Sequence, residues 1–199
     1  NADAKVSQPF HRLDVGRASS VGKVRTHNED SIITLDLFIE DNSGYVLNGL
    51  YAVADGMGGH EGGEIASKLA LQVFTESVMQ NLLVPALRNR NNFIEKDSIV
   101  KELVKAVSLA NMNIYDHAQA AGNGMGTTLT AALIIDRKAY FANVGDSRVY
   151  ALLGNQLTQV TRDHSVVAEL VDAGKITPDE VYTHPRRNMI TRCLGTYPK

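Results

Sequence analysis

Two apolar runs near the start of the chain have the composition of β-strands. Residues 31–38 are rich in β-branched and apolar side chains, and residues 48–54 form a short run that is apolar enough to be buried. The polar cluster at residues 40–44 contains Asn-Ser-Gly, which is typical of a turn. We therefore expect two strands joined by a turn.

Apolar residues recur at helical spacing in the two stretches that follow. The first predicted helix covers about residues 63–83 and ends before Pro85. The second has Asp97 or Ser98 as its candidate N-cap, and the glycine-rich residues 122–126 end it. Both helices should bury one apolar face.

The pattern then changes from a helical to a strand period. Four short strand candidates cover residues 127–136, 138–145, 147–153 and 156–161. Because their connections have the length of hairpin turns, we expect an antiparallel meander. From Asp163 onward the chain becomes polar and helical. Strands, two helices and then more strands indicate an α+β fold with helices packed on antiparallel sheets.

Composition and charge narrow the class of protein. The chain has 199 residues, 44% of them hydrophobic and 21% charged, which suits one globular domain. A net charge of −2 and a pI near 6.3 give no general attraction to nucleic acids or membranes. No apolar run approaches the roughly 18 residues of a membrane helix.

Two features bear on processing and compartment. Residues 1–13 contain no long apolar segment, so we interpret them as an N-terminal extension rather than a signal peptide, with residues 1–2 as a candidate tag remnant. The single cysteine, Cys193, excludes a disulfide within the chain. A reducing, cytoplasmic setting is the expectation.

The stretch ADGMGGHEGGE, residues 54–64, places five glycines directly after an apolar run. Glycine-rich loops after strands often cradle phosphate, but this one lacks the Lys-Ser/Thr of a P-loop and fits no dinucleotide fingerprint. Asp55, at the end of the predicted strand, either caps the loop or binds a cation. The neighbouring glycines would let backbone carbonyls and waters approach such an ion.

Two further acidic clusters favour the cation. Asp146 lies in a predicted tight turn within NVGDSR, and Glu29 and Asp30 end the sequence RTHNED just before the first strand. Oxygen-rich clusters suit Mg²⁺ or Mn²⁺, whereas one cysteine and dispersed histidines argue against zinc.

Four motifs occur in an order and spacing that resemble a known family. The sequences RTHNED, ADGMGGHEGGE, GMGTTLTAALI and NVGDSRVY look like the successive motifs of metal-dependent, type 2C serine/threonine protein phosphatases, in their bacterial form. The segment at about residues 163–192 resembles the flap of the family. The resemblance covers nearly the whole chain, from about Asp14 to Gly195.

The resemblance implies a sandwich of two antiparallel β-sheets flanked by antiparallel helix pairs. It makes residues 14–199 a truncated catalytic domain, because two late motifs with metal-ligating aspartates and the C-terminal strands are missing after Lys199. Open sheet edges could then allow self-association.

The resemblance also implies a ligand set for two Mn²⁺ or Mg²⁺ ions and a third, weaker one. Asp55 matches the bridging aspartate, Gly56 the glycine that offers its carbonyl, and Asp146 the aspartate of the third metal. Glu29 and Asp30 match the pair that holds metal-bound waters.

Two residues are expected to act on the substrate. Arg25 stands where the family has its phosphate-binding arginine. His60 is a candidate general acid, but it comes four positions after Gly56 rather than directly after it, so a role in positioning the substrate or ordering the loop stays equally open.

The expected function is dephosphorylation of phosphoserine and phosphothreonine in proteins by metal-activated water, with weak or absent activity in this chain. The expected partners are phosphoproteins of a serine/threonine kinase. Two alternatives remain, a pseudophosphatase that binds phosphoproteins without turnover and a nucleotide-binding module that uses the glycine loop.

Overall fold

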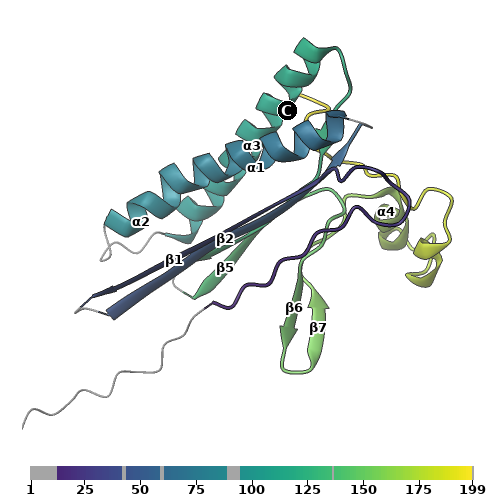
Figure 1. Cartoon of the computed structure of the whole chain (residues 1–199). Helices are drawn as coiled ribbons and strands as arrows, with labels where there is room; N and C mark the ends of the chain where they lie inside the picture. The colour runs from purple at the N-terminus through teal and green to yellow at the C-terminus, as the bar shows by residue number, and fades with distance from the viewer. Residues whose placement is uncertain (1–12, 42–43, 59–60, 89–94, 136, 199) are drawn as a thin grey trace, which may run out of the picture.

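The chain forms a sheet with two long helices on one face. The computed structural model describes residues 13–41, 44–58, 61–88, 95–135 and 137–198. Figure 1 shows α1 and α3 side by side over the sheet, and an extended N-terminal segment on the other side of it. Residues 1–12 of the predicted N-terminal extension lie outside the described set. Within that set, no helix is long and apolar enough to cross a membrane.

The strands and helices follow the predicted order. The strands are β1 (Asp30–Asp41), β2 (Gly44–Met57), β3 (Gly126–Thr127), β4 (Leu129–Ile135), β5 (Lys138–Val144), β6 (Tyr150–Leu153) and β7 (Gln156–Gln159). The helices are α1 (Glu61–Val78), the π-helical turn η1 (Met79–Leu83), α2 (Val84–Arg88), α3 (Lys96–Ala121), α4 (Val166–Asp172) and the 3₁₀ turn η2 (Asp179–Tyr182). The α+β class with antiparallel sheets is confirmed, and α1 with α3 is the helix pair that the described residues contain.

The expected four-stranded meander is wrong in one respect. The large sheet has the order β1-β2-β4-β5, with β3 paired to β2, whereas β6 and β7 pair only with each other in a second sheet. All of these pairs are antiparallel. At Gly145, with φ of +108°, the chain leaves the large sheet, so the connection at residues 145–146 joins two sheets rather than closing a hairpin.

The first helix also continues beyond its predicted end. Its α-helical part gives way to η1, and α2 follows without a break. α2 carries Pro85, which has no N–H to donate to the preceding turn, directly after the π-helical turn. The second long helix has Glu95 as its N-cap without a side-chain hydrogen bond, so the predicted caps are wrong. Asp97 lies instead in the first turn, where its charge suits the helix dipole. Gly122 ends this helix in the left-handed conformation, as expected.

The core lies between the sheet and the two long helices. Alternate residues of β2 and β4 face the helices, and small residues on α1 and α3 let the helices approach closely. The buried residues are Leu50, Ala52 and Ala54 of β2, Leu129, Ala131 and Leu133 of β4, Ala66, Ala70 and Phe74 of α1, and Ala106, Ala110 and Ile114 of α3. This packing fixes the direction in which β2 delivers its last residues.

The glycine loop makes a close backbone crossing between the end of β2 and the first turn of α1. A Cβ atom on Gly56 would overlap the carbonyl of Gly63, and one on Gly63 would lie 2.9 Å from Cδ of Glu29. The Gly56 N–H donates to the Glu29 carbonyl at 3.1 Å. The lack of side chains at these two glycines therefore lets the end of β2, the first turn of α1 and Glu29 pack against one another.

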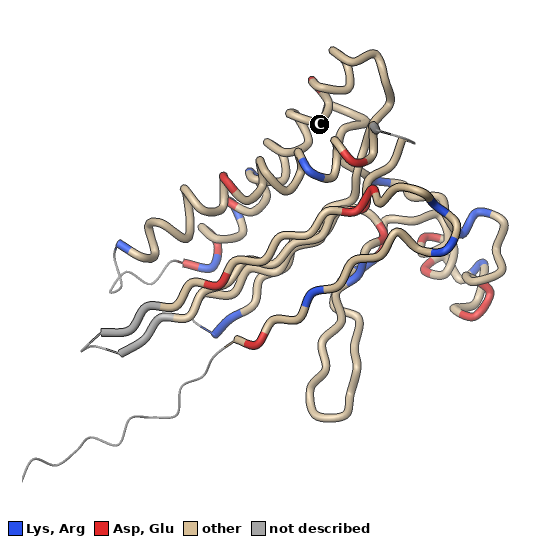
Figure 2. The backbone as a smooth tube through the Cα atoms, viewed as in Figure 1, with Lys and Arg blue, Asp and Glu red and all other residues tan. Residues whose placement is uncertain are grey.

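Charged residues are unevenly distributed. Figure 2 shows none on the β6–β7 hairpin, while acidic and basic residues gather on the segments around the end of the sheet where β2 meets α1. The uncharged hairpin instead exposes Leu152, Leu153 and Leu157. The hairpin is thus an uncharged, apolar projection, whereas the end of the large sheet beside α1 carries charged groups.

The glycine crossing predicts that Gly63→Ala destabilises the chain by about 1–3 kcal/mol, because the added methyl group has no space beside Glu29 and the Gly56 backbone. Gly62→Ala is the matched control, since its Cβ would lie 3.4 Å from Met125 Cβ, an ordinary contact. It should be neutral or stabilising by up to about 1 kcal/mol. Urea unfolding of both variants checks this, and equal stabilities would contradict the close crossing.

Candidate metal centre

A pocket of about 720 Å³ opens at the end of the large sheet. Segments that are far apart in the sequence form it: the residues before β1, the end of β2, the start of β4, the turn after β5, and the flap. Its lining consists of Val24, Arg25, Thr26, His27, Glu29, Asp55, Gly56, Met57, Gly58, Thr128, Asp146, Asn188 and Ile190. Five residues predicted for the site, Arg25, Glu29, Asp55, Gly56 and Asp146, are therefore brought together.

Arg25 and Glu29 form an ion pair at the rim of this pocket. Arg25 Nη1 donates to Glu29 Oε2 at 2.7 Å, with 65% of the arginine side chain exposed and 9% of the glutamate side chain. The buried glutamate therefore holds one N–H of the guanidinium group, and the remaining N–H groups of this largely exposed side chain can bind another acceptor. This arrangement suits the recognition of an anion in the pocket.

The backbone of Asp55 is held by two threonines from the strand beside it. Its N–H donates to Thr128 Oγ1 at 3.0 Å, and its carbonyl accepts from the Thr128 N–H and from Thr127 Oγ1, both at 2.9 Å. Thr128 Oγ1 also pairs with Ser147 Oγ at 2.9 Å, next to Asp146. The backbone of the aspartate is consequently held in place where the residue lines the pocket.

Negative charge accumulates around Asp55. Its pKa is raised to about 6, first by partial desolvation of the carboxyl group, then by the charges of Asp30 and Asp146 and a hydrogen bond with Asp30, while Arg25 acts in the opposite direction. A carboxylate held among like charges gains from a bound cation. The local electrostatics therefore favour a divalent ion here.

Asp30 has a different position from its neighbour Glu29. It is the register partner of Asp55 in the β1–β2 ladder. It also lines a smaller adjoining pocket of about 290 Å³, together with Asp55 and Ser147. Asp30 thus approaches Asp55 from the side, whereas Glu29 lies in the main pocket. The candidate His60 lies outside the described residues.

The donor set fits a hard cation, because the acidic side chains that line the pocket are the carboxylates of Glu29, Asp55 and Asp146, and no thiol lines it. In the described part of the chain, however, no three His, Cys, Asp or Glu side chains converge closely enough to hold an ion by themselves. Asp55 and Asp146 would be the residues that hold it, with other oxygen donors completing the coordination.

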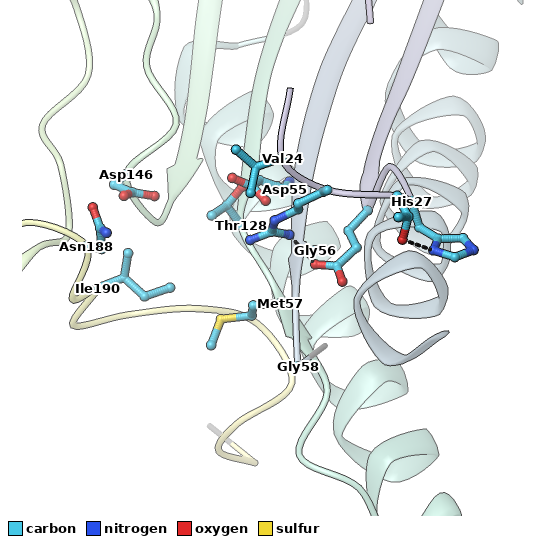
Figure 3. A pocket seen from close by; sticks show the side chains of 13 residues that line it. Val24, His27, Asp55, Gly56, Met57, Gly58, Thr128, Asp146, Asn188 and Ile190 are labelled. Atoms are coloured by element: carbon cyan, nitrogen blue, oxygen red, sulfur yellow. Dashed lines mark hydrogen bonds and ion pairs between the residues drawn. The ribbon is translucent and has the colours of Figure 1, made fainter. Parts of the chain in front are cut away.

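Several pocket residues were not predicted from the sequence. Asn188 and Ile190 come from the C-terminal segment after α4, and Figure 3 shows Asn188 beside Asp146 and both far from His27. Met57 and Thr128 also line the pocket. Both had a signal in the sequence, because Met57 lies in the motif ADGMGGHEGGE and Thr128 lies in the motif GMGTTLTAALI.

Comparison with known proteins bears on the identity of this pocket. Residues 15–170 match the family described as Protein phosphatase 2C. The chain belongs to the protein phosphatase 2C family. It is 36% identical over 174 residues to the serine/threonine phosphatase stp of Listeria welshimeri, covering 87% of this chain and 64% of that protein. The chain thus spans somewhat less than two thirds of this relative.

Solved structures of the family share the fold. Serine/threonine phosphatase Stp1 from Staphylococcus aureus has 33% sequence identity and a TM-score of 0.69, covering 96% of this chain and 71% of its own. The catalytic domain of the serine/threonine protein phosphatase PstP in complex with two manganese ions has 33% identity and a TM-score of 0.65, covering 88% and 64%.

The raised pKa of Asp55 predicts how stability depends on pH. The folded chain holds the Asp55 proton more tightly than the unfolded chain, whose carboxyl group titrates near 3.8. The metal-free protein should therefore lose stability as the pH rises from 3.8 to about 6, and should stay less stable above that range. Asp55→Asn should raise the melting temperature of the metal-free protein at pH 7.5, by roughly 2–4 °C for each 1 kcal/mol gained in the free energy of unfolding.

Asp14→Asn is the matched control, because Asp14 is exposed in the N-terminal segment away from the pocket. Differential scanning calorimetry measures the melting temperatures. Saturating Mn²⁺ should raise the melting temperature of the wild type and of the control but not that of Asp55→Asn. A lower melting temperature for metal-free Asp55→Asn would contradict the proposed charge crowding.

Proposed function

We propose that this chain carries the metal- and phosphate-binding part of a protein phosphatase that hydrolyses phosphoserine and phosphothreonine in proteins. The observation that carries the proposal is the convergence of Asp55, Asp146 and Arg25 on one open pocket. A cation site beside an anion-binding arginine is the arrangement that phosphoryl transfer to water requires. Membership of the protein phosphatase 2C family supports the same reaction.

Asp55 and the carbonyl of Gly56 are the groups that would hold two divalent ions, Mn²⁺ or Mg²⁺, and Asp146 would hold a third, weaker one. Such a metal pair supplies an acidified water and neutralises charge on the phosphoryl oxygens. The hydrogen bonds of Thr127 and Thr128 hold the backbone of Asp55, which supports the position from which its side chain enters the site. Glu29 acts through Arg25, since their ion pair already occupies it.

Arg25 binds and orients the phosphoryl group. Its largely exposed side chain lines the pocket, and charge-assisted hydrogen bonds to phosphate are short and directional. The pocket is open enough to accept a phosphorylated side chain presented on a protein, and the apolar side chains of Val24, Met57 and Ile190 lie around it. These apolar groups suit the aliphatic part of the phosphorylated residue. Phosphoproteins of a serine/threonine kinase are the substrates that this geometry supports.

The alternative is a pseudophosphatase that binds phosphoproteins without hydrolysing them. It is favoured by the absence of three converging metal-ligating side chains within the described residues. Weak metal binding and slow turnover are the expected outcome for the chain if it is an enzyme, because the ions must then rely on few carboxylates. Phosphate release and phosphopeptide binding must therefore be measured together.

The test is phosphate release from a phosphothreonine peptide with Mn²⁺ present, alongside calorimetric binding of the same peptide. The wild-type chain should release phosphate slowly, and EDTA should abolish this release. Arg25→Ala should raise KM roughly 10- to 100-fold, as expected for the loss of a charge-assisted hydrogen bond. Arg17→Ala is the matched control, because Arg17 lies in the same N-terminal segment but contacts Thr34 instead of the pocket.

Each result separates the candidate functions. Release that depends on Mn²⁺ and Arg25 supports the phosphatase. Binding that depends on Arg25, without any release, supports the pseudophosphatase. If Arg25→Ala and Arg17→Ala both match the wild type in binding and release, Arg25 has no role in phosphate recognition.

A further inference from the structure

His164 lies between β7 and α4, yet it is tied to the turn that follows β5. Its backbone N–H donates to the Gly145 carbonyl at 2.9 Å. In return, the Gly145 N–H donates to His164 Nδ1 at 3.2 Å. Gly145 directly precedes Asp146, so this reciprocal pair of hydrogen bonds fixes the backbone that presents the aspartate to the pocket.

The same histidine is tied to the segment around Ile190 and Thr191. The Thr191 N–H donates to the His164 carbonyl at 2.8 Å. The following residue, Ser165, forms an antiparallel β-bridge with Ile190, a residue of the pocket wall. His164 therefore connects two parts of the pocket, the turn of Asp146 and the segment of Ile190. Among the described residues, no other strand pairing joins these two parts.

The turn has little freedom to find another position. Gly145 is buried and has a φ of +108°, and a Cβ on it would lie 2.7 Å from Thr128 Cβ. Thr128 in turn accepts the hydrogen bond from the Asp55 N–H. Contacts thus run without interruption from Asp55 through Thr128 and Gly145 to His164 and the flap.

We propose that His164 is a positioning residue that holds the Asp146 turn and the Ile190 wall of the pocket in one fixed arrangement. This proposal rests on the proposed function only where it concerns metal binding, because the hydrogen bonds of His164 do not depend on a ligand. His164 does not line the pocket, so it acts through Gly145 rather than on the substrate.

Only one of the three hydrogen bonds requires a histidine side chain. Any residue would supply the backbone N–H and carbonyl, whereas the bond from Gly145 needs a side-chain acceptor at the position of Nδ1. Burial, with the charges of Arg192 and Arg162, lowers the pKa of His164, which keeps the ring neutral and Nδ1 able to accept. An asparagine could place its Oδ1 at about the same point, whereas an alanine could not.

The experiment compares the wild type with His164→Ala, His164→Asn and a matched control, His184→Ala. In the control, Nδ1 of His184 accepts the N–H of Arg186 at 3.1 Å, so the variant loses the same kind of hydrogen bond within the flap but none to the Asp146 turn. Amide hydrogen exchange by NMR on the metal-free proteins measures protection at Gly145 and Thr191. Calorimetry then measures the Mn²⁺ affinity of each variant.

His164→Ala should raise the exchange rate at Gly145 and weaken Mn²⁺ binding, each about fivefold, as expected for one hydrogen bond. His164→Asn and His184→Ala should both stay within about twofold of the wild type. Unchanged exchange at Gly145 in His164→Ala would overturn the proposal. So would faster exchange with unchanged Mn²⁺ affinity.

If His164→Ala does not fold, His164→Asn decides alone: wild-type exchange supports the proposal and unprotected Gly145 overturns it. If the wild type binds no Mn²⁺, the proposed function fails, while the exchange data still test His164. The two failures are therefore distinguishable.

Discussion

The backbone crossing of Gly56 and Gly63 is the contact on which the pocket depends. Because neither residue has a side chain, the first turn of α1 can lie against the end of β2, with the Glu29 side chain packed beside them. This contact sets the place of Glu29, which anchors Arg25, and of Asp55, the residue before Gly56. A bulkier residue at either glycine would separate the strand end from the helix.

A second constraint is electrostatic. Partial desolvation and then the charges of Asp30 and Asp146 raise the pKa of Asp55, so the ionised carboxyl group is disfavoured in the metal-free fold. Arg25 offsets part of this effect. Residues that oppose stability while converging on an open pocket are typical of functional sites. The fold tolerates the charge because the strands and the two-helix core around it are well packed.

The order of the strands and the long helices could be predicted from the periodicity of apolar residues, because regular elements such as β2 and α3 bury one face. Turn length, in contrast, cannot show whether the strands on either side pair with each other. The separation of β5 from β6 depends on the turn at Gly145 and its contact with the distant His164, which the sequence pattern does not reveal. The contribution of Asn188 and Ile190 could not be seen either, since more than forty positions separate them from Asp146 and only the folded flap brings them together. The sequence predicted that the glycines let ligands approach an ion; the structure adds that Gly56 and Gly63 let the first turn of α1 lie against the end of β2.

The most direct measurement is anomalous diffraction from crystals of the chain soaked in Mn²⁺. Because Mn²⁺ scatters anomalously, the map locates the ions independently of activity and of the protein fold. The account predicts a peak in the pocket within about 2.5 Å of an Asp55 carboxylate oxygen, a distance usual for oxygen ligands of hard cations. Ordered Mn²⁺ elsewhere in the crystal with none at Asp55 would contradict it.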